Sequence, residues 1–219
     1  MLNLSLLVWL LWSPLQPSDG SLLGGAFENR RLHLRVRPPV GWTIVSAGTT
    51  EDEPIEFWKE SENGPRIQIT SYPYQISDDS DIDKVQAELS EALKRKFPSL
   101  RVDQETKLIH QGNPAIEVMA TLPAGDTYYH VIQRCLFARG RLFIITCASF
   151  ESSFLSDLGT FRACLDSLEV LGEIFEPDAV GDGVPLFTAR TAGFVGFGLM
   201  AFGFFLRRFS VARLDRIGH

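Results

Sequence analysis

The densest group of ionisable side chains is a run of aspartates, Asp78, Asp79, Asp81 and Asp83, in the segment SDDSDID. Alternating carboxylates are ligands that a hard cation accepts, so Asp79, Asp81 and Asp83 are candidate metal ligands. No glycine stands at the tight-turn position and no glutamate closes the loop, as an EF-hand would require. We favour the alternative that these acids occupy the first turn of a helix, where the helix dipole favours negative charge.

The histidines of the central part, His33, His110 and His130, are scattered and form no His-x-x-x-His or His-Glu pattern. His130 with Cys135 would be a nucleophile pair, but alternation along one strand places them on opposite faces. His130 could instead contribute to a polar patch at a sheet edge. We favour an ordinary half-exposed strand residue.

The three cysteines, Cys135, Cys147 and Cys164, are too few for a disulfide framework, and no two share metal-ligand spacing. We expect buried free thiols. A single disulfide between Cys147 and Cys164 is the alternative in an oxidising compartment.

No Gly-x-Ser-x-Gly element, phosphate loop or dinucleotide fingerprint occurs in the sequence. Four aromatic residues would suit a recognition surface, although core packing explains Trp42 at least as easily: Trp42, Trp58, Tyr72 and Tyr74. The sequence therefore predicts no catalytic residue, no cofactor and no enzyme. Two alternatives are a hydrolase whose histidines, cysteines and acids converge in one pocket, and a cation-binding module that uses Asp78–Asp83.

About 145 residues, from Phe27 to Gly172, must position these side chains, which is enough for one domain with a core. Hydrophobic periodicity predicts a helix from Ile82 to Phe97, ended by Pro98, and a second helix entered through Ser152-Ser153. Alternation and turn residues predict strands at 32–45 (broken by prolines), 55–59, 66–74, 100–109, 115–122, 128–137 and 141–149.

The hairpin around Arg139-Gly140 is apolar on both faces, so both faces need cover. This turn places Cys135 opposite Ile144 and Cys147 on the other side of the sheet. We therefore predict an α+β fold, an antiparallel β-sheet flanked by helices on its faces.

The C-terminal part contains an uncharged run, TAGFVGFGLMAFGFFL at 191–206, closed by Arg207 and Arg208. Sixteen helical residues span only about 24 Å, so we expect the helix to begin near Ala189 and to cross a membrane at 189–207. A buried helix of a soluble domain is the alternative, although the run lacks a polar face. The predicted anchor residues are Phe194, Phe197, Phe202, Phe204, Phe205, Arg207 and Arg208.

Segments around this run complete the predicted topology. Residues 173–188 form an acidic spacer rich in proline and glycine, and residues 208–219 a basic cytoplasmic tail. Small residues at Ala192 and Gly196 would permit close helix approach in a homodimer.

The N-terminus carries a second apolar run from Leu4 to Trp12, whose length fits the hydrophobic region of a signal peptide within residues 1–18. A basic leader and a clean cleavage site are missing, so an uncleaved anchor or an irregular strand is the alternative. A signal peptide and a stop-transfer helix would together place the domain outside the cytoplasm, as a periplasmic or cell-surface domain.

Charge distribution agrees with this topology. The chain carries −6, but the last 13 residues hold four arginines against one aspartate, which leaves −9 for the first 206 residues. An acidic outer part above a basic cytoplasmic end follows the positive-inside rule. No basic patch typical of nucleic-acid binding is evident.

Three segments resemble the PsbP-like superfamily, which includes DcrB-like bacterial envelope proteins: LHLRVRPPVGWTI, HQGNPAIEVMATL and RGRLFIITCASFESSFLSDLGTFRACLDSLEV. The resemblance covers about residues 30–170 and implies an α/β/α sandwich. It also implies an accessory or binding role without a catalytic constellation. A membrane helix separates this chain from the extrinsic photosynthetic members, so a bacterial envelope protein is the nearer analogy.

These observations predict a single-pass membrane protein with an extracytoplasmic PsbP-like domain at 27–172. It would act by contact with a protein partner, in envelope assembly or stress.

Overall fold

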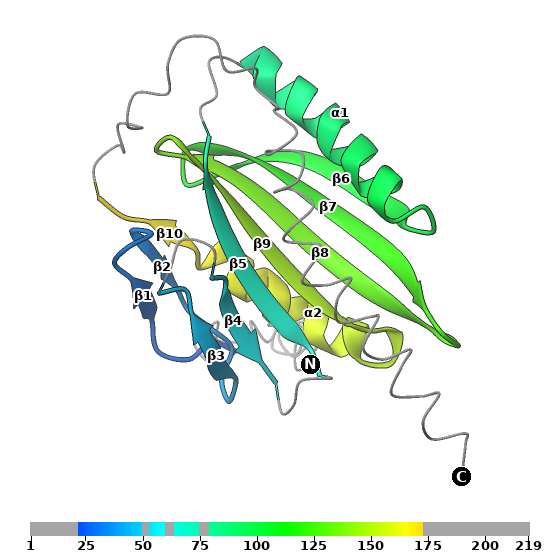
Figure 1. Ribbon diagram of the computed structural model, residues 1–219. Coiled ribbons are helices and arrows are strands. Elements are labelled where there is room, and N and C mark those ends of the chain that lie inside the picture. The colour runs from blue at the N-terminus through cyan, green and yellow to red at the C-terminus, as the bar shows by residue number, and fades with distance from the viewer. Residues whose placement is uncertain (1–21, 50–52, 60–63, 75–78, 173–219) are drawn as a thin grey trace, which may run out of the picture.

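The computed structural model describes residues 22–49, 53–59, 64–74 and 79–172. These residues form a seven-stranded antiparallel sheet, one long helix on each of its faces and a three-stranded sheet beside it (Figure 1). The predicted α+β class is confirmed for this part of the chain.

The large sheet has the strand order β3-β4-β5-β9-β8-β7-β6, and β3 and β6 are its edges. Its strands are β3 (Thr43–Ala47), β4 (Ile55–Trp58), β5 (Arg66–Pro73), β6 (Arg101–His110), β7 (Asn113–Ala124), β8 (Thr127–Ala138) and β9 (Arg141–Phe150). Three tight hairpins join β6, β7, β8 and β9, so their register follows from the turns.

Helix α1 (Asp79–Lys96) covers one face of the sheet with an apolar stripe at helical spacing. Ile82, Val85, Leu89 and Leu93 pack there against side chains that include Val118. The helix ends before Pro98, as the sequence predicts.

Helix α2 (Glu151–Asp166) covers the opposite face, where Phe161 and Leu165 are fully buried against β5, β8 and β9. It begins at Glu151, one residue before the predicted Ser152-Ser153 entry. Phe150, at the N-cap, makes no side-chain cap bond, so no N-cap signal marks this start in the sequence.

The small sheet has the order β1-β2-β10, formed by β1 (Phe27–Asn29), β2 (Leu34–Val36) and β10 (Glu169–Val170). Its inner side, with Leu34, Val36 and Leu168, joins the core under α2. The sequence analysis did not predict β1 or β10, because strands of three and two residues show almost no alternation.

Three turns place non-glycine residues in the left-handed region, including His33 between β1 and β2, with φ of 47°. Arg139 has φ of 53° beside Gly140, which confirms the predicted hairpin turn, and Cys135 lies opposite Ile144. Gln111 and Gly112 form the turn before β7. A turn expected from the residues Gly112-Asn113-Pro114 is therefore one residue late, since Asn113 and Pro114 already lie in β7. Pro114 pairs with Ile109 of β6 near the start of the strand, before the pairing of β7 with β8 begins at Ala115, so its missing N–H is tolerated.

No helix among the described residues is long and apolar enough to cross a bilayer. The predicted signal peptide, spacer, membrane helix 189–207, cytoplasmic tail and Ala192–Gly196 contact lie outside the described residues.

Candidate functional site

The strongest electrostatic feature is a buried ion-pair network between the sheet and α2. Arg134 on β8 and Glu117 on β7 are direct cross-strand partners, and both side chains are less than a tenth exposed. The Nε and NH2 groups of Arg134 donate to one Glu117 oxygen at 3.0 and 2.7 Å, and Arg162 of α2 donates to the other oxygen at 3.1 Å. A buried charge needs such compensation, so this network joins the sheet to α2.

His110 extends the network to the end of α2. Its Nε2 lies 2.8 Å from the Leu168 carbonyl oxygen, so Nε2 carries the proton and donates. Its Nδ1 lies 3.4 Å from the Arg134 NH1 group, which also donates to Asp166 at 2.9 Å. His110 is thus a connecting residue between β6, β8 and the start of β10.

A second polar chain crosses the same face near the other end of α2. The Thr121 hydroxyl donates to Asp103 at 2.5 Å, and the His130 Nδ1 lies 3.1 Å from that hydroxyl oxygen. Burial raises the pKa of Asp103, but hydrogen bonds from Thr121 and Arg101 lower it more, so the net shift is downward. The His130 ring stacks on Phe154 at 4.8 Å.

Ser149 is the cross-strand partner of His130, and His130 that of Thr121, so Ser149, His130, Thr121 and the hydrogen-bonded Asp103 follow one another over four strands. This row does not form a nucleophile pair: the Ser149 side chain is fully buried, and its hydroxyl has no hydrogen-bond partner among the described residues. A nucleophile must be within hydrogen-bond reach of its base and open to substrate.

The thiols are also unsuited to chemistry. Burial raises the pKa of Cys135 and of Cys164 to about 12, and it raises the pKa of Cys147 well above its usual range. A thiol must ionise to attack. All three cysteines are free and buried, Cys135 on the α1 face and Cys147 on the α2 face, as the register predicts. The Cys147–Cys164 disulfide is not formed in this structure.

The α1 face carries a row of polar side chains in register across four strands: Glu56, Gln68, Thr146 and Gln133. Gln68 donates to Glu56 at 2.6 Å and Gln133 to Thr146 at 3.1 Å. Because these buried side chains bond to one another in pairs, the row is a structural feature of the sheet.

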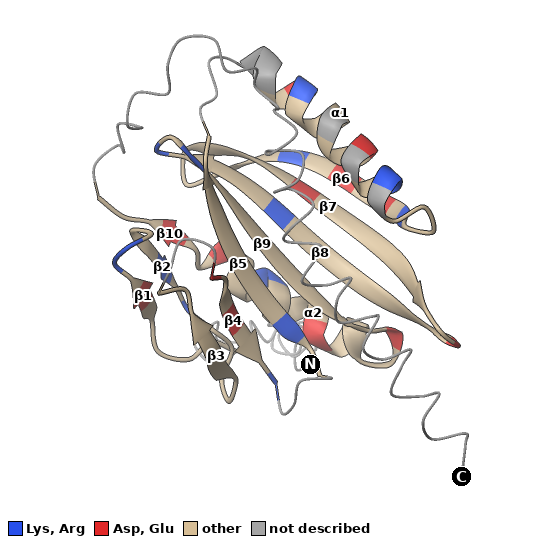
Figure 2. Ribbon diagram, viewed as in Figure 1, with Lys and Arg blue, Asp and Glu red and all other residues tan. Residues whose placement is uncertain are grey.

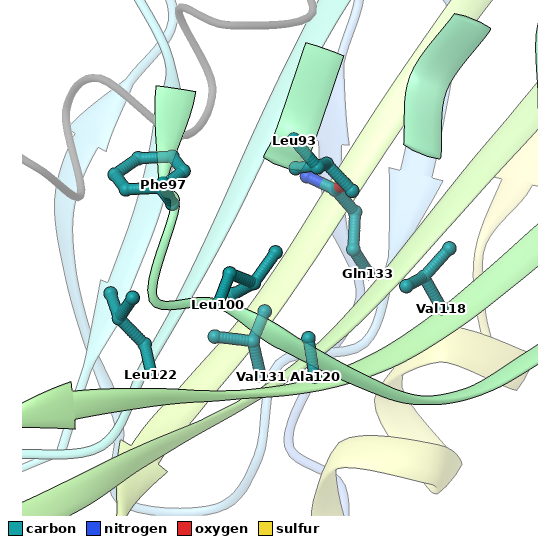
Figure 3. A pocket seen from close by; sticks show the side chains of 8 residues that line it. All are labelled: Leu93, Phe97, Leu100, Val118, Ala120, Leu122, Val131 and Gln133. Atoms are coloured by element: carbon teal, nitrogen blue, oxygen red, sulfur yellow. The ribbon is translucent and has the colours of Figure 1, made fainter. Parts of the chain in front are cut away.

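Gln133 also borders a narrow hollow under the end of α1 (Figure 3). Including its open mouth, the hollow contains about 330 Å³. Its other described lining residues are apolar: Leu93, Phe97, Leu100, Val118, Ala120, Leu122 and Val131. The hollow could hold an apolar ligand group against hydrocarbon side chains and one amide. None of its described lining residues is an acid, a general base or a nucleophile.

The outer surface of the small sheet is basic. The segment RRLHLRVR alternates so that Leu32, Leu34 and Val36 face the core. The arginines of this segment, Arg30, Arg31, Arg35 and Arg37, lie on the turn between β1 and β2 and along β2 (Figure 2). We call these four arginines the basic face.

Three of the exposed large apolar side chains fall within six residues, Val40, Ile44 and Val45, with exposed fractions of 60, 46 and 46%. They lie at or just before β3, an edge of the large sheet. We call them the β3 apolar patch. Clustered exposed apolar side chains at a sheet edge are typical of a contact surface.

The metal site proposed for Asp79, Asp81 and Asp83 stays a prediction. Asp83 forms an ion pair with Lys107 of β6, and the side chains of Asp79 and Asp81 lie outside the described residues. Within the described part, no three His, Cys, Asp or Glu side chains are placed to hold a metal ion. The helix begins at Asp79, so Asp79 and Asp81 lie in its first turn, in agreement with the favoured interpretation, and Asp83 follows in the second turn.

The other candidate residues are dispersed. His110 and His130 lie in different polar chains, and His130 and Cys135 are on opposite faces of β8, as alternation predicts. Trp42 packs edge-on against Phe161 at 6.0 Å, which confirms its core role. The sequence analysis did not predict the Glu117–Arg134 pair, although a turn at Gly125-Asp126 sets these two residues opposite each other.

An antiparallel sheet with one long helix on each face defines an α+β sandwich. No protein-family model matches the sequence, and no curated protein matches it significantly. Among solved structures, the chain is similar to the cyanobacterial PsbP (CyanoP) from Synechocystis, with a TM-score of 0.55 and 12% identity over 68% of this chain and 94% of that one.

Two further similarities have TM-scores below 0.5. The Ran-binding protein Mog1p of Saccharomyces cerevisiae has a TM-score of 0.45 and 13% identity over 68% of this chain and 96% of that one. LpqN of Mycobacterium tuberculosis, involved in cell envelope biogenesis, has a TM-score of 0.44 and 12% identity over 62% of this chain and 81% of that one. The likeness to CyanoP supports a PsbP-like fold for the described domain, in agreement with the sequence resemblance.

Proposed function

We propose that this protein is a membrane-tethered binding protein whose PsbP-like domain acts outside the cytoplasm by contact with a protein partner. The observation that carries the proposal is the role of the polar groups inside the domain. Glu117 and Arg134 neutralise each other, and burial keeps the three thiols protonated. These groups stabilise the fold and are not available for turnover, which favours a binding role.

The tether is inferred from the sequence. The uncharged run 191–206 and its flank Arg207-Arg208 have the composition of a stop-transfer helix. The acidic remainder of the chain agrees with an orientation in which only the short basic tail is cytoplasmic. Envelope assembly or stress is the process that we propose, by analogy with DcrB-like proteins.

The β3 apolar patch is the surface that we propose for the protein partner. Its members, Val40, Ile44 and Val45, are exposed, so burying them against a partner would remove apolar area from water without disturbing the core. The β-bulge between Ile44 and Ser46 interrupts the ladder at this edge, which favours side-chain contact over the addition of a further strand.

The tether is tested by alkaline carbonate extraction of membranes that contain the full chain. Charged residues at a helix centre cost about 2.5–3.5 kcal/mol each for insertion, so F197K/F202K should move the protein into the soluble fraction. The matched control, F175K/F187K, makes the same changes in the spacer and should leave the protein in the pellet. Extraction of the unaltered chain by carbonate would contradict the tether.

The partner surface is tested by crosslinking in intact cells followed by affinity capture. Ile44→Asp should abolish a crosslinked species that the unaltered chain gives, whereas Ile109→Asp, an equally drastic change at the opposite sheet edge, should retain it. Loss of the species with both variants, or with neither, would contradict the assignment of this surface.

A further inference from the structure

The basic face lies where the described domain ends. The β10 strand pairs with β2, and the Leu171 amide donates to the His33 carbonyl at 2.6 Å. A Cβ added to Gly172, the last described residue, would lie 3.0 Å from the His33 ring. The chain therefore leaves the domain beside the turn that carries Arg30 and Arg31, toward the spacer.

The composition of this surface is unusual for the molecule. Four arginines fall within eight residues of a chain whose net charge is −6. Arg35 is neutralised by Glu28 and Glu169 at 3.3 and 3.2 Å. Arg30, Arg31 and Arg37 are exposed and have no acidic partner among the described residues. The basic face thus presents uncompensated positive charge to solvent.

The arginines on this face serve little structural purpose. Arg31 donates to the Gly48 carbonyl at 3.2 and 3.1 Å, and Arg37 donates to the Gly24 carbonyl at 3.2 Å. Both arginines bond to neutral carbonyl acceptors, so these bonds leave their charge uncompensated. Asn29, which is buried, orders the turn through the Leu32 amide and the Ala47 carbonyl. The fold of the turn therefore does not require a run of arginines.

We propose that the basic face binds the anionic headgroups of the membrane to which the chain is tethered, and so orients the domain on the bilayer. This inference rests on the proposed tether. The 18 residues from Glu173 to Arg190 separate the domain from the apolar run, and a linker of this length has an average reach of about 23 Å. Because salt screens charges beyond about 8 Å at physiological ionic strength, the surface next to the chain exit is best placed to interact with the headgroups. Arginine suits this partner because its guanidinium binds phosphate in bidentate fashion.

The test uses the full chain in nanodiscs of phosphatidylcholine, with and without 30% phosphatidylglycerol, and a nitroxide on the lipid headgroup. A fluorophore is attached to Ala26→Cys, next to β1, or to Ala87→Cys on α1, across the large sheet. The buried native thiols do not compete for the label. We expect strong quenching at position 26 only in anionic discs, little quenching at position 87, and loss of the difference in 0.5 M NaCl.

Charge reversal identifies the surface. One basic residue near an anionic membrane changes the binding constant about five-fold, so R30E/R31E should lower the ratio of docked to undocked domain at least about 25-fold. The matched variant K94E/R95E, on exposed positions of α1, should leave quenching at position 26 unchanged.

Two results would overturn the inference. Equal quenching at position 26 in neutral and anionic discs would show that the basic face has another partner, such as the acidic spacer. If R30E/R31E and K94E/R95E lowered quenching at position 26 equally, docking would depend only on the net charge of the domain. Failure of the protein to co-elute with the discs contradicts the tether itself, which separates the two proposals.

Discussion

The arginines of the large sheet and those of the small sheet occupy opposite environments. Arg134 is buried, and two carboxylates and a histidine compensate it inside the domain. Arg30 and Arg37 are exposed, and the described domain provides them with no counter-charge. The same side chain therefore contributes to stability in one region and remains available for binding in the other.

This contrast indicates where function can lie in a protein without a catalytic constellation. Removing a charge that the fold has already paired in its interior destabilises the domain, so such charges carry little information about partners. Changes to unpaired surface charges, or to the β3 apolar patch, should alter the stability of the isolated domain only slightly. Variants in the two regions should therefore fail in different assays.

The largest expected effect is that of Arg134→Ala. It leaves Glu117 buried with only Arg162 as a partner, which should cost about 3–5 kcal/mol of unfolding free energy. The thermal midpoint should fall by about 10 °C, as measured by circular dichroism. Arg162→Ala, which removes a single half-exposed partner, is the control and should cost about 1 kcal/mol. An Arg134→Ala loss below 1 kcal/mol would show that the network is not a structural element.

The second prediction concerns the interior thiols. With a pKa of about 12 instead of 9, the fraction of Cys135 and of Cys164 present as thiolate at pH 8 is about a thousand-fold lower than for an ordinary thiol. Absorbance assays with a disulfide reagent should show no reaction of the native protein over minutes and reaction of all three thiols in 6 M guanidinium chloride. Rapid reaction of a native thiol would contradict the separation of an inert interior from a functional surface.

The third prediction concerns pH. Thr121→Val removes the hydrogen bond that helps to lower the pKa of Asp103, which should cost about 1 kcal/mol. Because the folded pKa is lowered, this stabilisation is present above the unfolded pKa of about 3.9 and is lost as pH falls through the folded value. In urea unfolding, the difference in unfolding free energy between the unaltered protein and Thr121→Val should be smaller at pH 3 than at pH 7. Thr106→Val, on an exposed site of β6, should show no such dependence.

The smallest stability effect is expected for R30E/R31E, which should change the unfolding free energy by less than about 1 kcal/mol in the same urea assay. The reason is that Arg30 makes no ion pair with a described residue, and Arg31 bonds only to a carbonyl. A loss of unfolding free energy comparable to that of Arg134→Ala would show that the arginines of the basic face are structural, and it would contradict the contrast between the two sheets.

Much of the large sheet could be predicted from the sequence because its hairpins are short and its strands alternate. The pairing of Cys135 with Ile144 follows from the Arg139-Gly140 turn alone. The small sheet could not be predicted, since β1 and β10 are very short and pair with β2 across distant parts of the chain.

The polar network of the interior was missed for a different reason. Glu117 and Arg134 each interrupt an apolar strand, and a single charged residue in such a strand is normally expected to face solvent. Only the register of the β7–β8 hairpin places them together, and only α2 buries them. The three-dimensional arrangement, more than residue type, decides which charges are structural.

The central claim is that the domain lies on the outer side of the membrane. Protease treatment of spheroplasts that express the full chain, followed by blotting with antibodies to the domain and to the C-terminal tail, tests it. We predict that external protease digests the domain and leaves a small membrane-protected fragment with the tail. Digestion of the domain only after lysis, from the cytoplasmic side, would contradict the account.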